Sequence, residues 1–206
     1  MGQRIAIVLF NLGGPDDQAS VQPFLQNLFS DPAIIRVPGP IRWALARIIS
    51  HTRAKSARAN YAKMGGGSPL VPESTKQARA LEVAVKAIPG YETAEVKAFL
   101  AMRYWKPFTS DAVRDVKAFT PDHIVLLPLY PQFSTTTTDS SLKAWQEAGG
   151  GAAKMGLCGG TGRDHVAAGL YPGLFATRPR AERGRAFRLA RRGQVVAPDR
   201  ANPRRG

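Results

Sequence analysis

The strongest structural signal in the sequence is the segment Arg4–Pro15, which reads RIAIVLFNLGGP. Its apolar run from Ile5 to Leu9 is closed by turn residues, a pattern typical of a strand buried on both faces of a parallel sheet. The apolar residues that follow repeat with helical spacing and predict a helix facing a core: Val21, Phe24, Leu25, Leu28 and Phe29. Asp31-Pro32 closes this helix. The first thirty residues therefore predict a strand, a glycine turn and a helix.

Two more strands are predicted, over Glu95–Met102 and His123–Leu129. The predicted helices lie between and after the strands: about Ile41–Met64 with Trp43, Leu45, Ile48 and Ile49 on its apolar side, about Pro72–Ile88, a helix capped by Ser110, and one that starts near Ser140. This alternation predicts a doubly wound α/β domain with a parallel, Rossmann-like sheet. Ligands of such sheets bind outside the carboxyl ends of the strands. We therefore expect a site at the three strand exits, residues 11–15, 103–107 and 130–141.

Charge divides the 206 residues into two parts. Residues 1–150 hold 17 Lys and Arg against 12 Asp and Glu, whereas residues 151–206 hold 12 against 3. Arg, Gly, Ala and Pro supply 35 of the last 56 residues, and helix or strand periodicity is weak there. We interpret residues 1–150 as the α/β domain and residues 151–206 as a basic tail. The tail is either disordered or the product of a shifted reading frame, and a nucleic-acid-binding arm is a third interpretation.

The sequence gives few signals of location. Cys158 is the single cysteine, so the chain forms no internal disulfide. The N-terminal apolar run is too short for a signal peptide, and no segment approaches the roughly 18–20 apolar residues of a membrane span. A cytoplasmic protein is the expectation.

Two glycine-rich turns lack the known nucleotide-binding patterns. Gly13-Gly14-Pro15 does not have the spacing of the dinucleotide fingerprint, and Gly65–Ser68 is not followed by the lysine of a P-loop. Three segments nevertheless have an uncommon make-up: Tyr61–Leu70, Met102–Tyr104 and Leu127–Ser134. Aromatic rings beside bare glycine backbone suit a large, flat, apolar ligand, while hydroxyls and arginine suit its polar edge.

Together with Asn11–Pro15 and Phe24–Asp31, these segments resemble the ferrochelatase family, in the family's order and over about residues 4–148. The resemblance implies a lyase that inserts Fe²⁺ into protoporphyrin IX, the last step of haem synthesis. It also implies a fold of two Rossmann-like domains with the porphyrin between them, of which this chain carries the N-terminal half. Fe²⁺ is a substrate here, and no permanently bound cofactor is expected.

The resemblance also implies a set of porphyrin-binding residues: Leu12, Arg53, Tyr61, Ser68 and Tyr130. Arg53 and Ser68 would meet the propionates, and Leu12 would lie beside the point of metal insertion. Ordinary structural roles stay open for all five. Arg53 is equally compatible with a solvated helix residue, Ser68 with a loop cap, and the other three with packing.

The chain departs from the family in its catalytic residues. The family's Ser-Ala-His-Gly-like string and its later acidic residue are absent, and His51, His123 and His165 do not replace them, so no catalytic residue and no metal site are assigned. Asp139 also stands where the family favours glycine. We therefore expect a truncated chain with weak or no activity. The alternatives are a non-catalytic porphyrin-binding fragment and a basic-tailed nucleic-acid-binding protein, although no nucleic acid is expected as partner. Peripheral membrane association and oligomeric state stay open.

Overall fold

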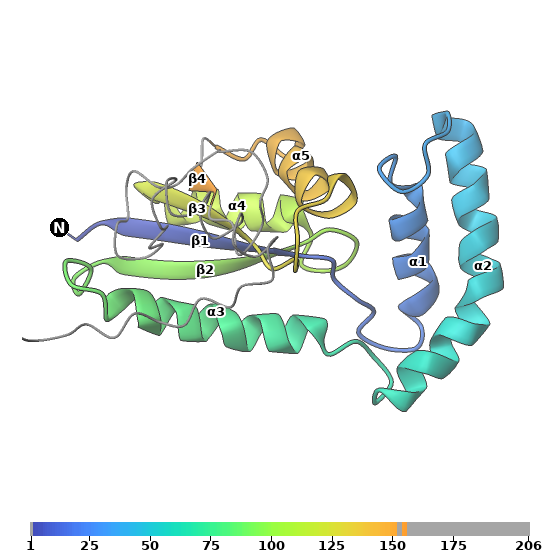
Figure 1. The fold of residues 1–206 in the computed structure, drawn as a ribbon, viewed down its shortest axis with the longest axis horizontal. Helices are drawn as coiled ribbons and strands as arrows, with labels where there is room; N and C mark the ends of the chain where they lie inside the picture. The colour runs from blue at the N-terminus through green and yellow to red at the C-terminus, as the bar shows by residue number, and fades with distance from the viewer. Residues whose placement is uncertain (1, 152–153, 156–206) are drawn as a thin grey trace, which may run out of the picture.

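The structure is a computed structural model that describes residues 2–151 and 154–155. Its elements follow in this order (Figure 1): β1 Arg4–Asn11, α1 Val21–Ser30, α2 Gly39–Lys63, α3 Leu70–Lys86, β2 Glu95–Met102, α4 Thr109–Phe119, β3 His123–Pro128, the π-helical turn η1 Thr135–Asp139, α5 Ser140–Glu147 and β4 Lys154–Met155. The predicted tail, with Cys158 and His165, lies outside the described residues apart from residues 151, 154 and 155.

The four strands form one sheet in the order β2-β1-β3-β4, and every neighbouring pair is parallel. β1 is a central strand, paired along its length with β2 and over Ile5–Phe10 with β3. Residues 5–10 are all at most 2% exposed, as expected for a strand covered on both faces. The predicted α/β fold with a parallel sheet is therefore confirmed.

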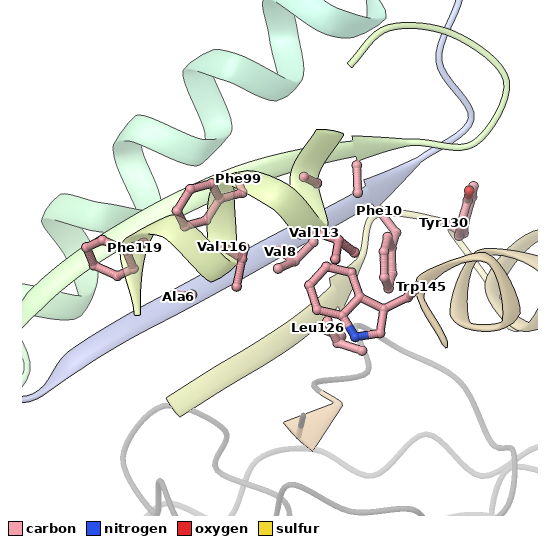
Figure 2. Packing of buried hydrophobic residues seen from close by; sticks show 12 residues of the cluster. Ala6, Val8, Phe10, Phe99, Val113, Val116, Phe119, Leu126, Tyr130 and Trp145 are labelled. Atoms are coloured by element: carbon pink, nitrogen blue, oxygen red, sulfur yellow. The ribbon is translucent and has the colours of Figure 1, made fainter. Parts of the chain in front are cut away.

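Alternate side chains of β1 enter two separate cores because successive residues of a strand point to opposite faces. On one face, Ala6, Val8 and Phe10 pack against residues of α4 and α5 (Figure 2). The ring of Phe10 meets the indole of Trp145 edge-on, with centroids 6.2 Å apart. On the other face, Ile5, Ile7 and Leu9 pack with α3 residues such as Val85. Both cores are local consequences of one apolar run.

The pair of helices α1 and α2 stands apart from this layered arrangement. In Figure 1 both lie beyond the carboxyl ends of the strands, roughly across the strand direction. The predicted inner face of α1 is confirmed, since Val21, Phe24 and Leu25 are buried. These residues form a third cluster with Tyr104, which follows β2. The helical pair is thus joined to the sheet at its carboxyl edge.

The predicted packing face of α2 is wrong. Trp43, Leu45 and Ile48 are exposed, at 58%, 37% and 60%, and Ile49 is only partly buried. The buried residues of α2 are small ones four apart, Ala46, Ser50 and Ala54. A stripe at positions i, i+4 and i+8 lies on one face of a helix, and its small side chains allow α1 to approach closely. The large apolar residues consequently point outward.

The predicted cap of α4 is also wrong. The helix begins at Thr109, so Ser110 falls inside its first turn and is exposed. The carboxylate of Asp111 instead accepts a hydrogen bond from the Phe108 backbone N–H at 3.0 Å. An acidic side chain in the first turn also suits the positive end of the helix dipole.

The bounds of two other elements differ from the prediction by one or two residues, since α3 begins at Leu70 and β3 ends at Pro128.

Candidate functional site at the carboxyl edge of the sheet

The three strand exits lie together, as predicted. The Asn11 carbonyl accepts a hydrogen bond from the Arg103 N–H at 2.9 Å, and the Leu12 carbonyl accepts one from the Tyr104 N–H at 3.0 Å. Parallel pairing between the first and second strands thus continues into their exits. On the other side, the Leu129 N–H donates to the Phe10 carbonyl at 2.8 Å. The first two exits are therefore anchored to each other by their backbones, and the third leaves the sheet beside β1.

The two glycine turns that the sequence singled out contact each other. The Ser68 N–H donates to the Pro15 carbonyl at 2.8 Å. A Cβ added to Gly14 would overlap the side chain of Ser68, and one added to Gly67 would overlap the Asp16 carbonyl. Glycine allows this close approach, because a side chain on Gly67 would meet backbone atoms and one on Gly14 would meet the Ser68 side chain. The turn that contains Leu12 and the loop that contains Ser68 consequently form one corner of the fold.

Tyr61 joins the same corner from the last turn of α2. Its carbonyl accepts a hydrogen bond from the Gly66 N–H at 2.8 Å, which folds the glycine loop back onto the helix end. Its ring and the side chains of Leu12 and Trp105 pack on the cluster formed by α1 and Tyr104. Burial raises the pKa of the Tyr61 hydroxyl above its usual value, so the side chain stays uncharged even above the pH at which a free tyrosine ionises.

Arg53 and Tyr130 have other surroundings than the three residues of this corner. Arg53 is exposed on α2, eight residues before Tyr61, which corresponds to about 12 Å along the helix axis. Tyr130 is 7% exposed, belongs to the core of Phe10 and Trp145, and shares a 2.9 Å hydrogen bond with the Ser141 hydroxyl. Burial raises the pKa of Tyr130, although the Ser141 bond and the charge of Arg103 oppose the change.

A cavity of about 550 Å³ opens at the same edge of the sheet, on the side of α3. Its wall includes Leu9, Asn11, Leu81 and Leu129 in addition to Tyr130. Arg53, Tyr61 and Ser68 do not line it. The structure thus brings Leu12, Tyr61 and Ser68 together, and places Tyr130 on the wall of a mostly apolar hollow that also includes Asn11 and Leu70.

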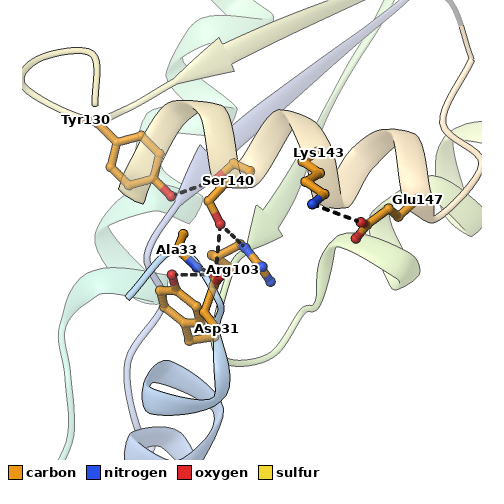
Figure 3. Close-up of polar contacts among 9 residues, drawn as sticks. Asp31, Ala33, Arg103, Tyr130, Ser140, Lys143 and Glu147 are labelled. Carbon is orange, nitrogen blue, oxygen red and sulfur yellow. Dashed lines mark hydrogen bonds and ion pairs between the residues drawn. The ribbon is translucent and has the colours of Figure 1, made fainter. Parts of the chain in front are cut away.

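A buried carboxylate that sequence analysis did not assign to the site lies between the helical pair and the sheet (Figure 3). The Asp31 side chain is 3% exposed. Its Oδ2 accepts hydrogen bonds from the Tyr104 hydroxyl and the Ser140 hydroxyl, both at 2.8 Å, and lies 2.7 Å from Arg103 Nη2. Its Oδ1 accepts from the Ala33 N–H at 2.7 Å. Both oxygens are therefore bonded.

The protonation of this cluster follows from its contacts. Burial of Asp31 opposes ionisation, but the hydrogen bonds from Ala33, Ser140 and Tyr104, with the Arg103 charge, hold its pKa below the usual value. Burial and the Asp31 carboxylate raise the pKa of Tyr104, which keeps its proton and donates it. In the sequence, Asp31 marked the end of a helix and belonged to the segment Phe24–Asp31 that resembles the family, and no contact was predicted for it. Nothing near Asp31 in the chain signals that Arg103 and Ser140 meet it.

The described histidines lie away from this corner. His51 is exposed on α2 beside Arg47 and Thr52, and His123 starts β3, at the opposite end of the strands from the glycine turns. Asp139 is exposed at the end of the π-helical turn that follows β3. Within residues 2–151 and 154–155, no group of three or more His, Cys, Asp or Glu side chains could hold a metal ion. In the same part of the chain, no helix has both the length and the apolar character needed to cross a membrane.

Comparison with known proteins gives one consistent result. A family profile described as Ferrochelatase matches residues 4–157. A curated ferrochelatase of Caulobacter vibrioides is 65% identical over 148 residues, 71% of this chain and 42% of that protein. One of Hyphomonas neptunium is 58% identical over 161 residues, 77% of this chain and 44% of the relative. One of a Wolbachia species is 48% identical over 142 residues, 69% and 44% of the two chains. The chain thus spans less than half the length of these curated relatives.

Proposed function

The chain belongs to the ferrochelatase family, and we propose that its residues 1–150 form a chelatase domain that binds protoporphyrin IX for the insertion of Fe²⁺. The observation that carries this proposal is the contact between the two glycine turns, which gathers Leu12, Tyr61 and Ser68 at one corner of the carboxyl edge. Such corners outside the strand ends are where α/β sheets bind ligands.

A flat macrocycle suits the surface of this corner. Gly65 and Gly66 have no atoms near the positions that a Cβ would take, so their backbone is bare beside Tyr61. A porphyrin laid against Tyr61 and Leu12 buries apolar area, which contributes roughly 25 cal/mol per Å² before ordering costs. Leu12 adds contact area there, beside the point at which the metal would enter.

The propionates need donors at the edge of the site. The Ser68 hydroxyl lies at the corner itself, where it also accepts a hydrogen bond from the Leu70 N–H at 3.3 Å. Arg53, about 12 Å along α2 from Tyr61, would meet the periphery of a macrocycle that rests on that tyrosine. Charge-assisted bonds between a guanidinium and a carboxylate are short and about twice as strong as neutral ones. Tyr130 completes the proposed set from the third strand exit.

Insertion exchanges two protons for one metal ion. Fe²⁺ binds the four ring nitrogens while two pyrrole N–H bonds break, and both protons must reach a base or water. A site that holds the ring distorted brings its nitrogen lone pairs toward the transition state. No described residue is proposed as this base, and weak or absent turnover by this chain stays our prediction. The cytoplasmic location inferred from the sequence belongs to the same proposal.

Fluorescence titration of the full 206-residue chain with protoporphyrin IX tests the binding proposal. We expect saturable binding that weakens about tenfold in Arg53→Ala and in Ser68→Ala, because each removes a propionate donor worth roughly 1.5 kcal/mol. Arg79→Ala is the matched control, since Arg79 is an exposed arginine on α3 away from the corner. Absence of binding by the parent chain would reject the proposal.

An anaerobic assay with protoporphyrin and Fe²⁺ tests the prediction about turnover. Binding without haem formation would support a non-catalytic porphyrin-binding chain. Haem formation at a rate typical of enzymes, with a kcat of about 1 s⁻¹ or more, would contradict the prediction of weak activity and leave the binding proposal intact.

A further inference from the structure

The cluster around Asp31 connects three parts of the chain that are far apart in sequence. Asp31 follows α1, Arg103 and Tyr104 follow β2, and Ser140 starts α5. Figure 3 shows Arg103 and Ser140 beside the Asp31 carboxylate. Arg103 Nε also donates to the Ser140 hydroxyl at 2.8 Å, so the contacts close a ring of Asp31, Arg103 and Ser140.

These contacts supply most of the polar attachment of α1 to the sheet. Among the described residues, hydrogen bonds and ion pairs from α1 and Asp31 to the sheet side go to the exit of β2 and to Ser140. The other member of this set is the Asn27 side-chain amide, which donates to the Tyr104 carbonyl at 3.1 Å. α2 packs on α1 through small side chains, so its position depends on that of α1.

The proposed porphyrin corner depends on the same attachment. Tyr61 comes from α2, whereas Leu12 follows β1, and both pack on the cluster that contains Tyr104. The Tyr104 side chain therefore makes two kinds of contact. Its ring packs with the apolar residues beneath the corner, and its hydroxyl donates a hydrogen bond to Asp31. The Arg103 guanidinium lies over that ring, 5.1 Å from its centre, so the partner of Asp31 also contacts the ring.

We infer that Asp31 is a positioning residue: its carboxylate holds Arg103 and Tyr104 so that the pair α1–α2 stays seated on the carboxyl edge and keeps Tyr61 beside Leu12. The link to the porphyrin rests on the proposed function. The seating of the helical pair is a property of the fold and can be measured without any ligand.

Hydrogen–deuterium exchange of the full chain at neutral pH tests this inference. In Asp31→Asn, one carboxylate charge is lost and the largely buried Arg103 keeps its own, which leaves that cation unpaired. We expect amides of residues 21–63 to exchange at least tenfold faster, while amides of β1 and β2 keep their protection. Asp111→Asn is the matched control, because it removes a carboxylate bonded to Arg114 and Phe108 at the start of α4.

The double variant Asp31→Asn with Arg103→Gln distinguishes an effect of the unpaired charge from a simple loss of packing. Removal of the unpaired charge should restore at least half of the lost protection in residues 21–63, because the two sites are coupled. Tyr104→Phe keeps the ring and removes one bond, so it should raise exchange two- to fivefold. This milder variant also tests the inference if Asp31→Asn does not fold.

Protoporphyrin affinity is the second arm of the experiment. We expect Asp31→Asn to weaken binding about tenfold, and the double variant to recover part of the loss. Unchanged exchange in residues 21–63, or an equal increase in the strands, would overturn the inference. If the parent chain does not bind porphyrin but the exchange results are as expected, the proposed function fails and the positioning role stands.

Discussion

The sheet and the helical pair α1–α2 are held by different physical means. β1 is buried by apolar side chains on both faces, with one core towards α3 and another towards α4 and α5. The helical pair packs internally against small residues of α2 such as Ala46 and keeps Trp43 and Ile48 exposed. It meets the exit of β2 through the apolar cluster that contains Tyr104 and, in addition, through the charged cluster around Asp31. The stability of the sheet should therefore depend on the volume of its buried side chains and not on pH. The attachment of the helical pair to the sheet should depend in addition on the charge of Asp31.

Truncation of Phe10 should give the largest effect. Phe10 is fully buried and contacts Trp145, so Phe10→Ala should lower the free energy of unfolding by about 4 kcal/mol. Urea denaturation followed by circular dichroism measures this change. Ile48→Ala is the control, because that side chain is 60% exposed and its loss should cost less than about 0.5 kcal/mol. Similar losses in the two variants would contradict the distinction between core and outer face.

Asp31→Asn should give the next largest loss in the free energy of unfolding, and this loss should depend on pH. Breaking a buried ion pair costs about 3 kcal/mol, the lower end of the usual range because Arg103 is partly solvated. The folded pKa of Asp31 is lowered, so its stabilisation is fully present above the unfolded value of about 3.9 and is lost as pH falls through the folded pKa.

Denaturation of the parent and of Asp31→Asn from pH 7 to pH 2 checks the sign of this dependence. The difference in unfolding free energy should be constant from pH 7 to about pH 5 and should shrink below pH 4. A difference that grows towards acid would mean that the carboxyl is held protonated in the folded chain.

The close packing of α1 on α2 gives the third prediction. Ala46 is fully buried in the stripe of small residues, so Ala46→Leu should force the helices apart at a cost of about 2 kcal/mol. Ala44→Leu is the matched control, because Ala44 is exposed on the same helix. If Ala46→Leu leaves the thermal midpoint unchanged, α1 does not seat on this stripe.

The contact between the glycine turns should give the smallest change in stability. A Cβ on Gly14 would overlap the Ser68 side chain, so the Ser68 loop has to move, and Gly14→Ala should cost at least about 1 kcal/mol, the lower end of the range for overpacking. Gly39→Ala is the control, since a Cβ there meets only the distant end of the Arg42 side chain. The same variant should weaken porphyrin binding several-fold. Unchanged affinity would separate the glycine contact from the proposed site.

The contrast between the two regions also explains what the sequence could predict. β1, β2 and β3 were found within two residues at each end, because long apolar runs between turns have few other interpretations. The prediction of the packing face of α2 was wrong because it relied on the large apolar residues of the helix and not on its stripe of alanine and serine. Asp31 was not foreseen as a contact of Ser140, since tertiary contacts between such distant residues leave no local pattern.

Only some of the porphyrin-binding residues inferred from family resemblance lie together in the structure. The two glycine segments were separate motifs in the sequence, and only the fold shows that they touch. Leu12, Tyr61 and Ser68 share one corner, while Arg53 is exposed on α2 and Tyr130 is buried against Ser141. Their roles towards a porphyrin remain predictions. A site built on loop-to-loop contacts depends on tertiary structure, so motif spacing alone could not give its shape.

The most direct test of the account is a titration of the ¹⁵N-labelled chain with protoporphyrin IX, followed by NMR. We predict that the amide signals of residues 12–14, 61 and 65–68 shift or broaden first, with those of β1 and α4 unchanged. Perturbation confined to the exposed face of α2 around Trp43 and Ile48, or no perturbation at all, would contradict a porphyrin site at the glycine corner.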